Sequence, residues 1–153
     1  MRGYAVHRSR TMNIYGEPIL IALQDSAIRE FVYESLCRFG LCNCTVVENE
    51  MAAFSCIWAG IAESPCAPYT MVIGDDPRAG NTTLDLPQIL QYHRLFRNIG
   101  IILLTDHERK LGSRDYRMLV EYLPVTLTFS QLVSSVYSVW RKLQLFREGD
   151  YVH

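Results

Sequence analysis

The chain has 153 residues, of which 49% are hydrophobic and 20% are charged, and this length fits a single domain. Its 15 Lys and Arg against 16 Asp and Glu give a net charge of −1, which argues against a general nucleic-acid-binding protein because such a protein needs a basic face. The apolar content excludes disorder over most of the length, and no apolar run is long enough to span a membrane.

The cysteine content indicates a compartment. The chain has five cysteines, an odd number, and no apolar run follows Arg2, Arg8 and Arg10 as it would in a secretory signal. This usage fits a reducing environment better than a disulfide scaffold. We therefore expect a cytoplasmic protein.

The first half of the chain predicts an arm followed by alternating strands and helices. Residues 1–17 are polar and aperiodic, which is typical of a loose, flexible N-terminal arm. A continuous apolar run at 19–23 predicts a buried strand, and Asp25 and Ser26 then provide an N-cap signal for a helix that Gly40 ends. A second strand is predicted at 42–47, a second helix at 50–62 and a loop with two prolines at 64–68.

The second half continues the alternation. Strands are predicted at 69–73, 99–104 and 123–127, and helices at 84–97 and 113–121. Ser130 is the expected cap of a last helix, whose apolar positions recur at helical spacing: Leu132, Val133, Val136, Val139, Trp140 and Leu143.

Five strand–helix repeats predict an α/β fold. Strands that alternate with helices imply a doubly wound, five-stranded parallel sheet with helices on both faces. We expect one domain at 18–146 and a C-terminal tail at 147–153. In such sheets function gathers at the carboxyl ends of the strands, which directs attention to the residues after each strand.

Four segments at these strand ends resemble a known family. Residues 19–30 (ILIALQDSAIRE), 69–75 (YTMVIGD), 101–105 (IILLT) and 122–132 (YLPVTLTFSQL) are similar, in this order, to motifs of the receiver domain of response regulators, the CheY-like domain of two-component signalling. The resemblance covers roughly residues 18–146. It implies the flavodoxin-like (CheY-like) strand order, a phosphate-accepting aspartate at Asp75 and a hydroxyl at Thr105 that hydrogen-bonds the phosphoryl group.

Two positions depart from the pattern of the family. Working receivers carry two acidic residues after the first strand that hold Mg²⁺, and here those positions are Leu23 and Gln24. Mg²⁺ prefers hard, charged oxygens, and without it a carboxylate and a phosphoryl donor repel each other. Receivers also carry a lysine at the end of strand five, and here that position is Val125 or, in the other register, Leu127.

The remaining pocket consists of Asp75, Asp76, Thr105, Gln24 and Asp25. It is either a residual phosphoacceptor site with unusual metal ligands or a degenerate pocket, in which Asp75 hydrogen-bonds nearby backbone. We favour the degenerate pocket, with no catalytic residue and no bound metal.

A possible partner surface follows from the same resemblance. Tyr122 matches the aromatic residue on strand five whose rotamer reports phosphorylation in working receivers. Together with Val133, Tyr137 and Trp140 it predicts an interaction face on helix four, strand five and helix five, used by a partner or by a homodimer. Ordinary core burial of Val133 and Trp140 is the competing interpretation.

The remaining candidate sites have weaker support in the sequence. Cys42 and Cys44, with Cys37, could form a metal or redox site, but buried packing is the favoured interpretation. The segment Asp106-His107-Glu108 is expected to be a solvated loop. His93 lies on a predicted helix, and the sequence indicates no catalytic or ligand-binding partner for it. Gly74 belongs to no glycine-rich phosphate-binding motif.

These observations predict a non-enzymatic pseudo-receiver without a cofactor. It would act by binding a protein, such as a sensor kinase or another regulator, independently of aspartyl phosphorylation. One alternative is an atypical single-domain response regulator phosphorylated at Asp75 by a histidine kinase, with Mg²⁺ held by Gln24, Asp25 and Asp76. The alternative from another class is a small flavodoxin-like cofactor-binding domain, although the segment after strand one has no glycine.

Overall fold

A computed structural model describes residues 13–63, 68–77, 85–106 and 118–152. Its elements in chain order are β1 (Ile19–Ala22), α2 (Ser26–Arg38), β2 (Cys44–Val47), α3 (Glu50–Glu63), β3 (Met71–Asp75), α4 (Leu86–Leu90), the 3₁₀ helix η2 (Phe96–Asn98), β4 (Gly100–Thr105), β5 (Val120–Pro124) and α5 (Phe129–Val152). Within the described residues, no helix is both long enough and apolar enough to cross a membrane.

The strands form one parallel sheet in the order β2-β1-β3-β4-β5. Ile21 lies opposite Val46 on one side and Ile73 on the other, so β1 and β3 occupy the centre of the sheet. This is the flavodoxin-like order, and it confirms the predicted fold class. All the carboxyl ends meet at one edge, which brings the ends of β1, β3 and β4 together.

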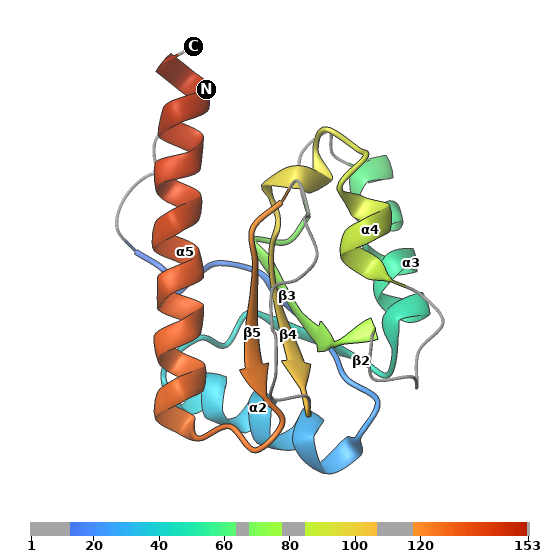
Figure 1. The fold of residues 1–153 in the computed structure, drawn as a ribbon, viewed down its shortest axis with the longest axis vertical. Coiled ribbons are helices and arrows are strands. Elements are labelled where there is room, and N and C mark those ends of the chain that lie inside the picture. Colours follow the sequence, from blue (N-terminus) through green and yellow to red (C-terminus); the bar gives the residue numbers. More distant parts are fainter. Residues whose placement is uncertain (1–12, 64–67, 78–84, 107–117, 153) are drawn as a thin grey trace.

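Two helical layers cover the two faces of the sheet (Figure 1). On one face, α2 and α5 pack over alternate strand residues such as Ile21, Ile73 and Ile102. On the other face, α3 and α4 pack over Leu20 and Val72. The alternation of side chains along each strand produces these two cores, and it explains why the central strands are apolar throughout.

The first helix begins and ends as its sequence predicts. The Asp25 carboxylate accepts a hydrogen bond from the Ile28 N–H at 3.0 Å, which caps the start of α2. At the other end Gly40 has φ +96°, and the Leu41 N–H reaches back to the Leu36 carbonyl at 2.8 Å. This is the Schellman arrangement, which favours glycine because other residues are strained at positive φ.

The last helix starts two residues earlier than predicted and runs further. Thr128, not Ser130, is its cap: the Gln131 N–H donates to the Thr128 hydroxyl at 3.1 Å, while the Thr128 N–H donates to Gln131 Oε1 at 2.9 Å. This reciprocal pair is a capping box. Residues 147–152 of the predicted tail belong to the same helix, which extends past the amino-terminal edge of the sheet (Figure 1).

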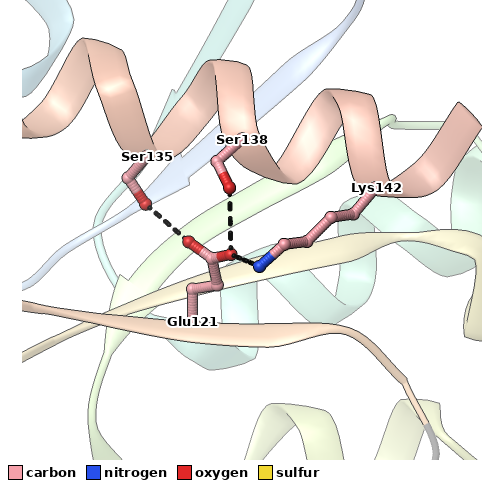
Figure 2. A network of polar contacts seen from close by, with 4 residues as sticks. All are labelled: Glu121, Ser135, Ser138 and Lys142. Carbon is pink, nitrogen blue, oxygen red and sulfur yellow. Dashed lines mark hydrogen bonds and ion pairs between the residues drawn. The ribbon is translucent and has the colours of Figure 1, made fainter.

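A polar network joins the edge strand β5 to α5 (Figure 2). The Glu121 carboxylate accepts hydrogen bonds from Ser135 at 3.2 Å and Ser138 at 3.3 Å, and it pairs with the Lys142 ammonium at 2.7 Å. An inward-pointing charge on an edge strand discourages pairing with another sheet, and here its hydrogen bonds offset the cost of partial burial.

Three predicted elements differ in the structure. Strand five lies at Val120–Pro124, three residues before the predicted start at 123, and consequently residues 118–121 are not helical; the rest of the predicted 113–121 helix lies outside the described residues. The predicted 84–97 helix is shorter, because α4 ends at Leu90 and a turn and η2 follow.

The end of the predicted arm is part of the domain. Ile14 is 3% exposed and packs in the α2–α5 core, and the Asn43 amide donates to the Gly16 carbonyl at 3.0 Å. The Thr70 hydroxyl also hydrogen-bonds the Glu17 carboxylate. Residues 13–17 are therefore held in place, while 1–12 lie outside the described residues.

Candidate functional site: the carboxyl edge of the sheet

Asp75 ends β3 at the centre of the carboxyl edge. Its Oδ2 accepts a hydrogen bond from the Gln24 N–H at 3.0 Å, so the segment after β1 closes over the end of β3. Burial raises the pKa of the Asp75 carboxyl above its usual value; the Gln24 hydrogen bond lowers it, and the nearby Asp25 charge raises it. Gln24, Asp25 and Asp75 thus lie together, as the sequence predicted, and Asp75 hydrogen-bonds backbone.

A second carboxylate reaches this edge that the sequence analysis did not single out. Glu50 is the first residue of α3 and is 3% exposed, and its Oε2 accepts a hydrogen bond from the Asp75 N–H at 3.3 Å. The sequence could have indicated Glu50, because it follows strand two closely and the carboxyl end of that strand lies at the same edge of the sheet.

Asp76 and Thr105 complete the pocket on the β4 side. Asp76 is 1% exposed and its N–H donates to the Leu104 carbonyl at 3.0 Å, while Thr105 ends β4 and is 3% exposed. Both residues also take part in further interactions. The residues of the predicted pocket therefore lie at the ends of β1, β3 and β4.

The register of strand five decides which residue stands beside Thr105. Pro124 pairs with Thr105, and the Val125 N–H donates to the Thr105 carbonyl at 3.0 Å. Leu127 lies beyond the strand and is buried in the α2–α5 core. Of the two residues that the sequence left open for the lysine position, Val125 is therefore the one whose backbone contacts Thr105, and its side chain is apolar.

The end of β1 does not offer the ligands that Mg²⁺ prefers. The Leu23 side chain is fully buried in the α2–α5 core, and Asp25 caps α2. The Arg29 guanidinium donates to the Leu23 carbonyl at 2.6 Å and to the Gln24 carbonyl at 3.3 Å. A cationic side chain therefore occupies the backbone oxygens where hard ligands could have converged, and these residues do not fit a magnesium site.

Arg29 was also missed in the sequence analysis. It lies one turn into α2, and helical side chains tilt toward the N-terminus, so its guanidinium returns to the strand end that precedes the helix. Among the described residues, no group of three or more His, Cys, Asp or Glu side chains is arranged to hold a metal ion.

Solved structures with the same architecture establish the fold. NtrX from Brucella abortus, solved in complex with ADP, superposes with a TM-score of 0.67 at 15% identity over 90% of this chain. The receiver domain of the histidine kinase CKI1 from Arabidopsis thaliana, complexed with Mg²⁺ and BeF₃⁻, gives 0.59 at 12% identity over 84% of this chain and 89% of its own.

A third match is the N-terminal domain of a response regulator/sensory box/GGDEF three-domain protein from Carboxydothermus hydrogenoformans, with a TM-score of 0.58 and 17% identity over 90% of this chain and all of that domain. The chain has the receiver fold. It spans only 29% of the NtrX chain. No protein-family model matches it, and no curated protein matches it in sequence.

The predicted interaction face is not a single patch in this receiver fold. Trp140 is fully buried in the α2–α5 core, which corrects its assignment to a surface. Tyr122 is half-buried and packs on the opposite face of the sheet, against the α3–α4 core. Val133 is half-buried, and Tyr137 is 43% exposed. Of the four aromatic and apolar residues, Tyr137 alone is exposed.

The cysteine cluster lies at the opposite, amino-terminal end of β2. Cys42 is exposed, which corrects the expectation that the thiols are buried, and its Sγ lies 3.8 Å from the Cys37 carbonyl oxygen. Cys44 is half-buried and donates to the Leu41 carbonyl at 3.2 Å. Burial is the largest cause that raises the pKa of the Cys44 thiol to about 12, so this sulfur stays protonated.

Two further candidates also lie away from the pocket. His93 is not helical: it follows α4 in a turn, its Nδ1 accepts from the Leu95 N–H at 3.2 Å, and its ring stacks on Phe96 with centroids 4.3 Å apart. Asp106 is exposed at the end of β4, while His107 and Glu108 lie outside the described residues.

Proposed function

We propose that this chain is a non-enzymatic pseudo-receiver of two-component signalling, which acts by binding a protein and not by accepting a phosphoryl group. The observation that supports this most directly is the pair of hydrogen bonds from the Arg29 guanidinium to the carbonyl oxygens of Leu23 and Gln24. A cation already holds the end of β1, and the adjacent side chains are a buried leucine and a neutral amide.

The environment of Asp75 supports the same conclusion. A phosphoacceptor carboxylate must be ionised and its developing charge must be neutralised during transfer. Here burial raises the pKa of Asp75, one of its oxygens is engaged by the Gln24 N–H, and Val125 stands beside Thr105 where a lysine would supply charge. Each of these features weakens phosphoryl transfer.

The proposed partner is a sensor kinase or another regulator. Tyr137 is exposed on α5, its ring lies 5.7 Å from the buried Trp140 ring, and the Arg141 guanidinium lies 6.0 Å from the Tyr137 ring centroid. An exposed aromatic side chain that packs on a buried ring and lies beside a cation is a suitable anchor for a protein partner. The predicted homodimer through this side of the molecule stays a proposal.

One alternative keeps a specific supporting observation. Asp75 is only partly buried and Thr105 ends the neighbouring strand, which is the arrangement that an atypical phosphoacceptor would use. The flavodoxin-like cofactor domain has less support, because the β1–α2 segment contains no glycine with which to cradle a phosphate.

A small phosphodonor separates the two receiver proposals. The protein is incubated with acetyl phosphate and Mg²⁺, and its intact mass and oligomeric state are measured beside those of Asp75→Asn. The pseudo-receiver predicts no phosphoryl adduct in either protein and no change in size. An adduct present in the wild type, absent from Asp75→Asn and mapped to Asp75 would instead establish the atypical response regulator.

A further inference from the structure

The outward face of α3 is apolar although it faces solvent. Glu50 and Glu63 are the first and last residues of the helix, and no charged residue lies between them. Met51 is 64% exposed and Trp58 is 44% exposed. A helix on the surface of a monomer normally turns a charged or polar stripe outward, so a helix that is apolar on both faces indicates a second contact.

The apolar surface continues from α3 onto the neighbouring segment. Trp58 makes edge-to-face contacts with His93 at 5.6 Å and with Phe96 at 5.4 Å between ring centroids. On the same side, Ile89 is 37% exposed and Tyr92 is 68% exposed. Figure 1 shows α3 and α4 side by side on the face of the sheet opposite α5. Trp58 therefore joins the two elements into one surface, which we name the α3 face: Met51, Trp58, Ile89 and Tyr92.

Two exposed residues of opposite charge belong to the two neighbouring elements of the α3 face. Glu63 is exposed at the end of α3, whereas Arg94 is exposed on the segment that follows α4. A two-fold axis parallel to α3 would bring the acidic side of one molecule against the basic side of its partner, and the reverse. Glu63 and Arg94 are therefore available as a pair of opposite charges beside the apolar centre of such a dimer.

We infer that the α3 face is a homodimer interface, which buries Trp58 against a second copy of this chain and pairs Glu63 with Arg94 across the two-fold axis. This surface lies on the opposite side of the sheet from Tyr137, so a dimer leaves the proposed partner site on α5 accessible. The inference does not depend on whether Asp75 is phosphorylated.

Sedimentation velocity from low to high micromolar protein tests this directly. The wild-type chain is expected to shift from monomer to dimer as its concentration rises. Trp58→Glu places a charge at the centre of the face and is expected to raise the dimer dissociation constant by about tenfold or more. Phe31→Glu is the matched control, because Phe31 is 39% exposed on α2 against 44% for Trp58 on α3, and it should leave the dissociation constant unchanged.

A charge exchange gives a second measurement that does not rely on the tryptophan. Glu63→Arg and Arg94→Glu should each weaken the dimer, and the double variant should restore it, because both contacts of the symmetric pair are re-formed with opposite sign. Circular dichroism of each variant checks that it is folded.

Fluorescence adds an independent readout. Trp140 is fully buried, so quenching by acrylamide reports mainly on Trp58, and it should decrease as the dimer forms. A wild type that stays monomeric at every concentration would overturn the inference and leave the α3 face to a different protein. A dimer that Tyr137→Glu disrupts and folded Trp58→Glu does not would overturn it as well.

Discussion

At the scale of single residues, hydrogen bonds within the protein already engage the polar groups around Asp75. Asp75 accepts from the Gln24 N–H through Oδ2, and its own N–H is engaged by the buried Glu50 carboxylate. Arg29 fixes the two carbonyls at the end of β1. The pocket is therefore connected across three elements, and its charges serve the local structure.

Replacing Asp75 by asparagine should stabilise the protein at neutral pH. The folded-state pKa of Asp75 is raised, mainly by burial, so the folded protein binds the proton more tightly than the unfolded chain does. The ionised carboxylate therefore costs stability, fully so above the folded pKa and not at all below the unfolded one. Asparagine avoids this cost and can still accept the Gln24 hydrogen bond.

The expected gain for Asp75→Asn is no more than about 1 kcal/mol, because water screens a half-exposed carboxylate. Thermal unfolding at a series of pH values measures it. The difference between variant and wild type should be largest near pH 7 and should shrink as the pH falls toward the pKa of an ordinary aspartate. An asparagine variant that is less stable than the wild type at neutral pH would contradict this assignment.

The sequence predicted the pocket residues that follow strands but missed those that reach it from helices. Asp75, Thr105 and Gln24 were found because a parallel sheet brings strand ends to one edge. Glu50 reaches Asp75 from α3, 25 positions away in the sequence, and its approach depends on how that helix packs on the sheet, which local patterns do not encode. The Arg29 contact is local, because Leu23 and Gln24 lie six and five positions before it, and the sequence analysis overlooked it.

At the scale of elements, the close approach of α5 to the sheet positions the rest of the molecule. A Cβ at Gly100 would lie 2.4 Å from Val139 Cγ1 and 3.2 Å from Leu143 Cδ1. Glycine is therefore required where β4 begins, because the helix rests directly on the strand backbone. The same helix supplies Ser135, Ser138 and Lys142 to the Glu121 network.

Adding one methyl group at Gly100 should disturb this contact. Gly100→Ala is expected to cost about 1–3 kcal/mol in the free energy of unfolding, because the core has no room for the new atom. Val139→Ala removes the atom that it would meet, so the double variant should be more stable than the sum of the two single changes predicts. Urea unfolding of the four proteins measures this coupling.

Gly16→Ala is the matched control for the added methyl group, because no atom lies within 4 Å of the position that its Cβ would take. Its free energy of unfolding should change by less than about 0.5 kcal/mol. If Gly100→Ala were equally neutral, α5 would not rest on β4 as closely as the structure shows.

Strand five was placed wrongly because it lies at the edge of the sheet. β5 lies at the edge of the sheet and carries Glu121, so it lacks the continuous apolar run that identified β1, β3 and β4. Its charge is compensated by α5, a contact between residues 14 to 21 positions apart. The cap at Thr128 is a local motif, T-x-x-Q, and it could have been recognised in the sequence.

At the scale of the whole molecule, the receiver fold was predictable because each strand–helix repeat carries its own pattern. Four motifs in the right order then fixed the resemblance, and the observed strand order agrees with it. The surfaces were less predictable. Trp140 and Tyr137 are three residues apart on one helix, yet one is fully buried and the other is 43% exposed.

The molecule thus exposes Tyr137 on α5 and Trp58 on α3, on opposite faces of a sheet whose carboxyl edge carries Asp75. In a working receiver, the state of that edge controls the surfaces. In the pseudo-receiver proposed for this chain, the surfaces are constitutive, and regulation follows from which partner is present.

A titration with beryllofluoride and Mg²⁺ tests this central proposal most directly, because beryllofluoride imitates a phosphoryl group on an aspartate only where a metal site forms. Tryptophan fluorescence and size-exclusion chromatography follow the folded wild type and Asp75→Asn at millimolar Mg²⁺. A pseudo-receiver gives no saturable change in either protein. A saturable response in the wild type that Asp75→Asn abolishes would contradict the proposal and identify a phosphorylation switch.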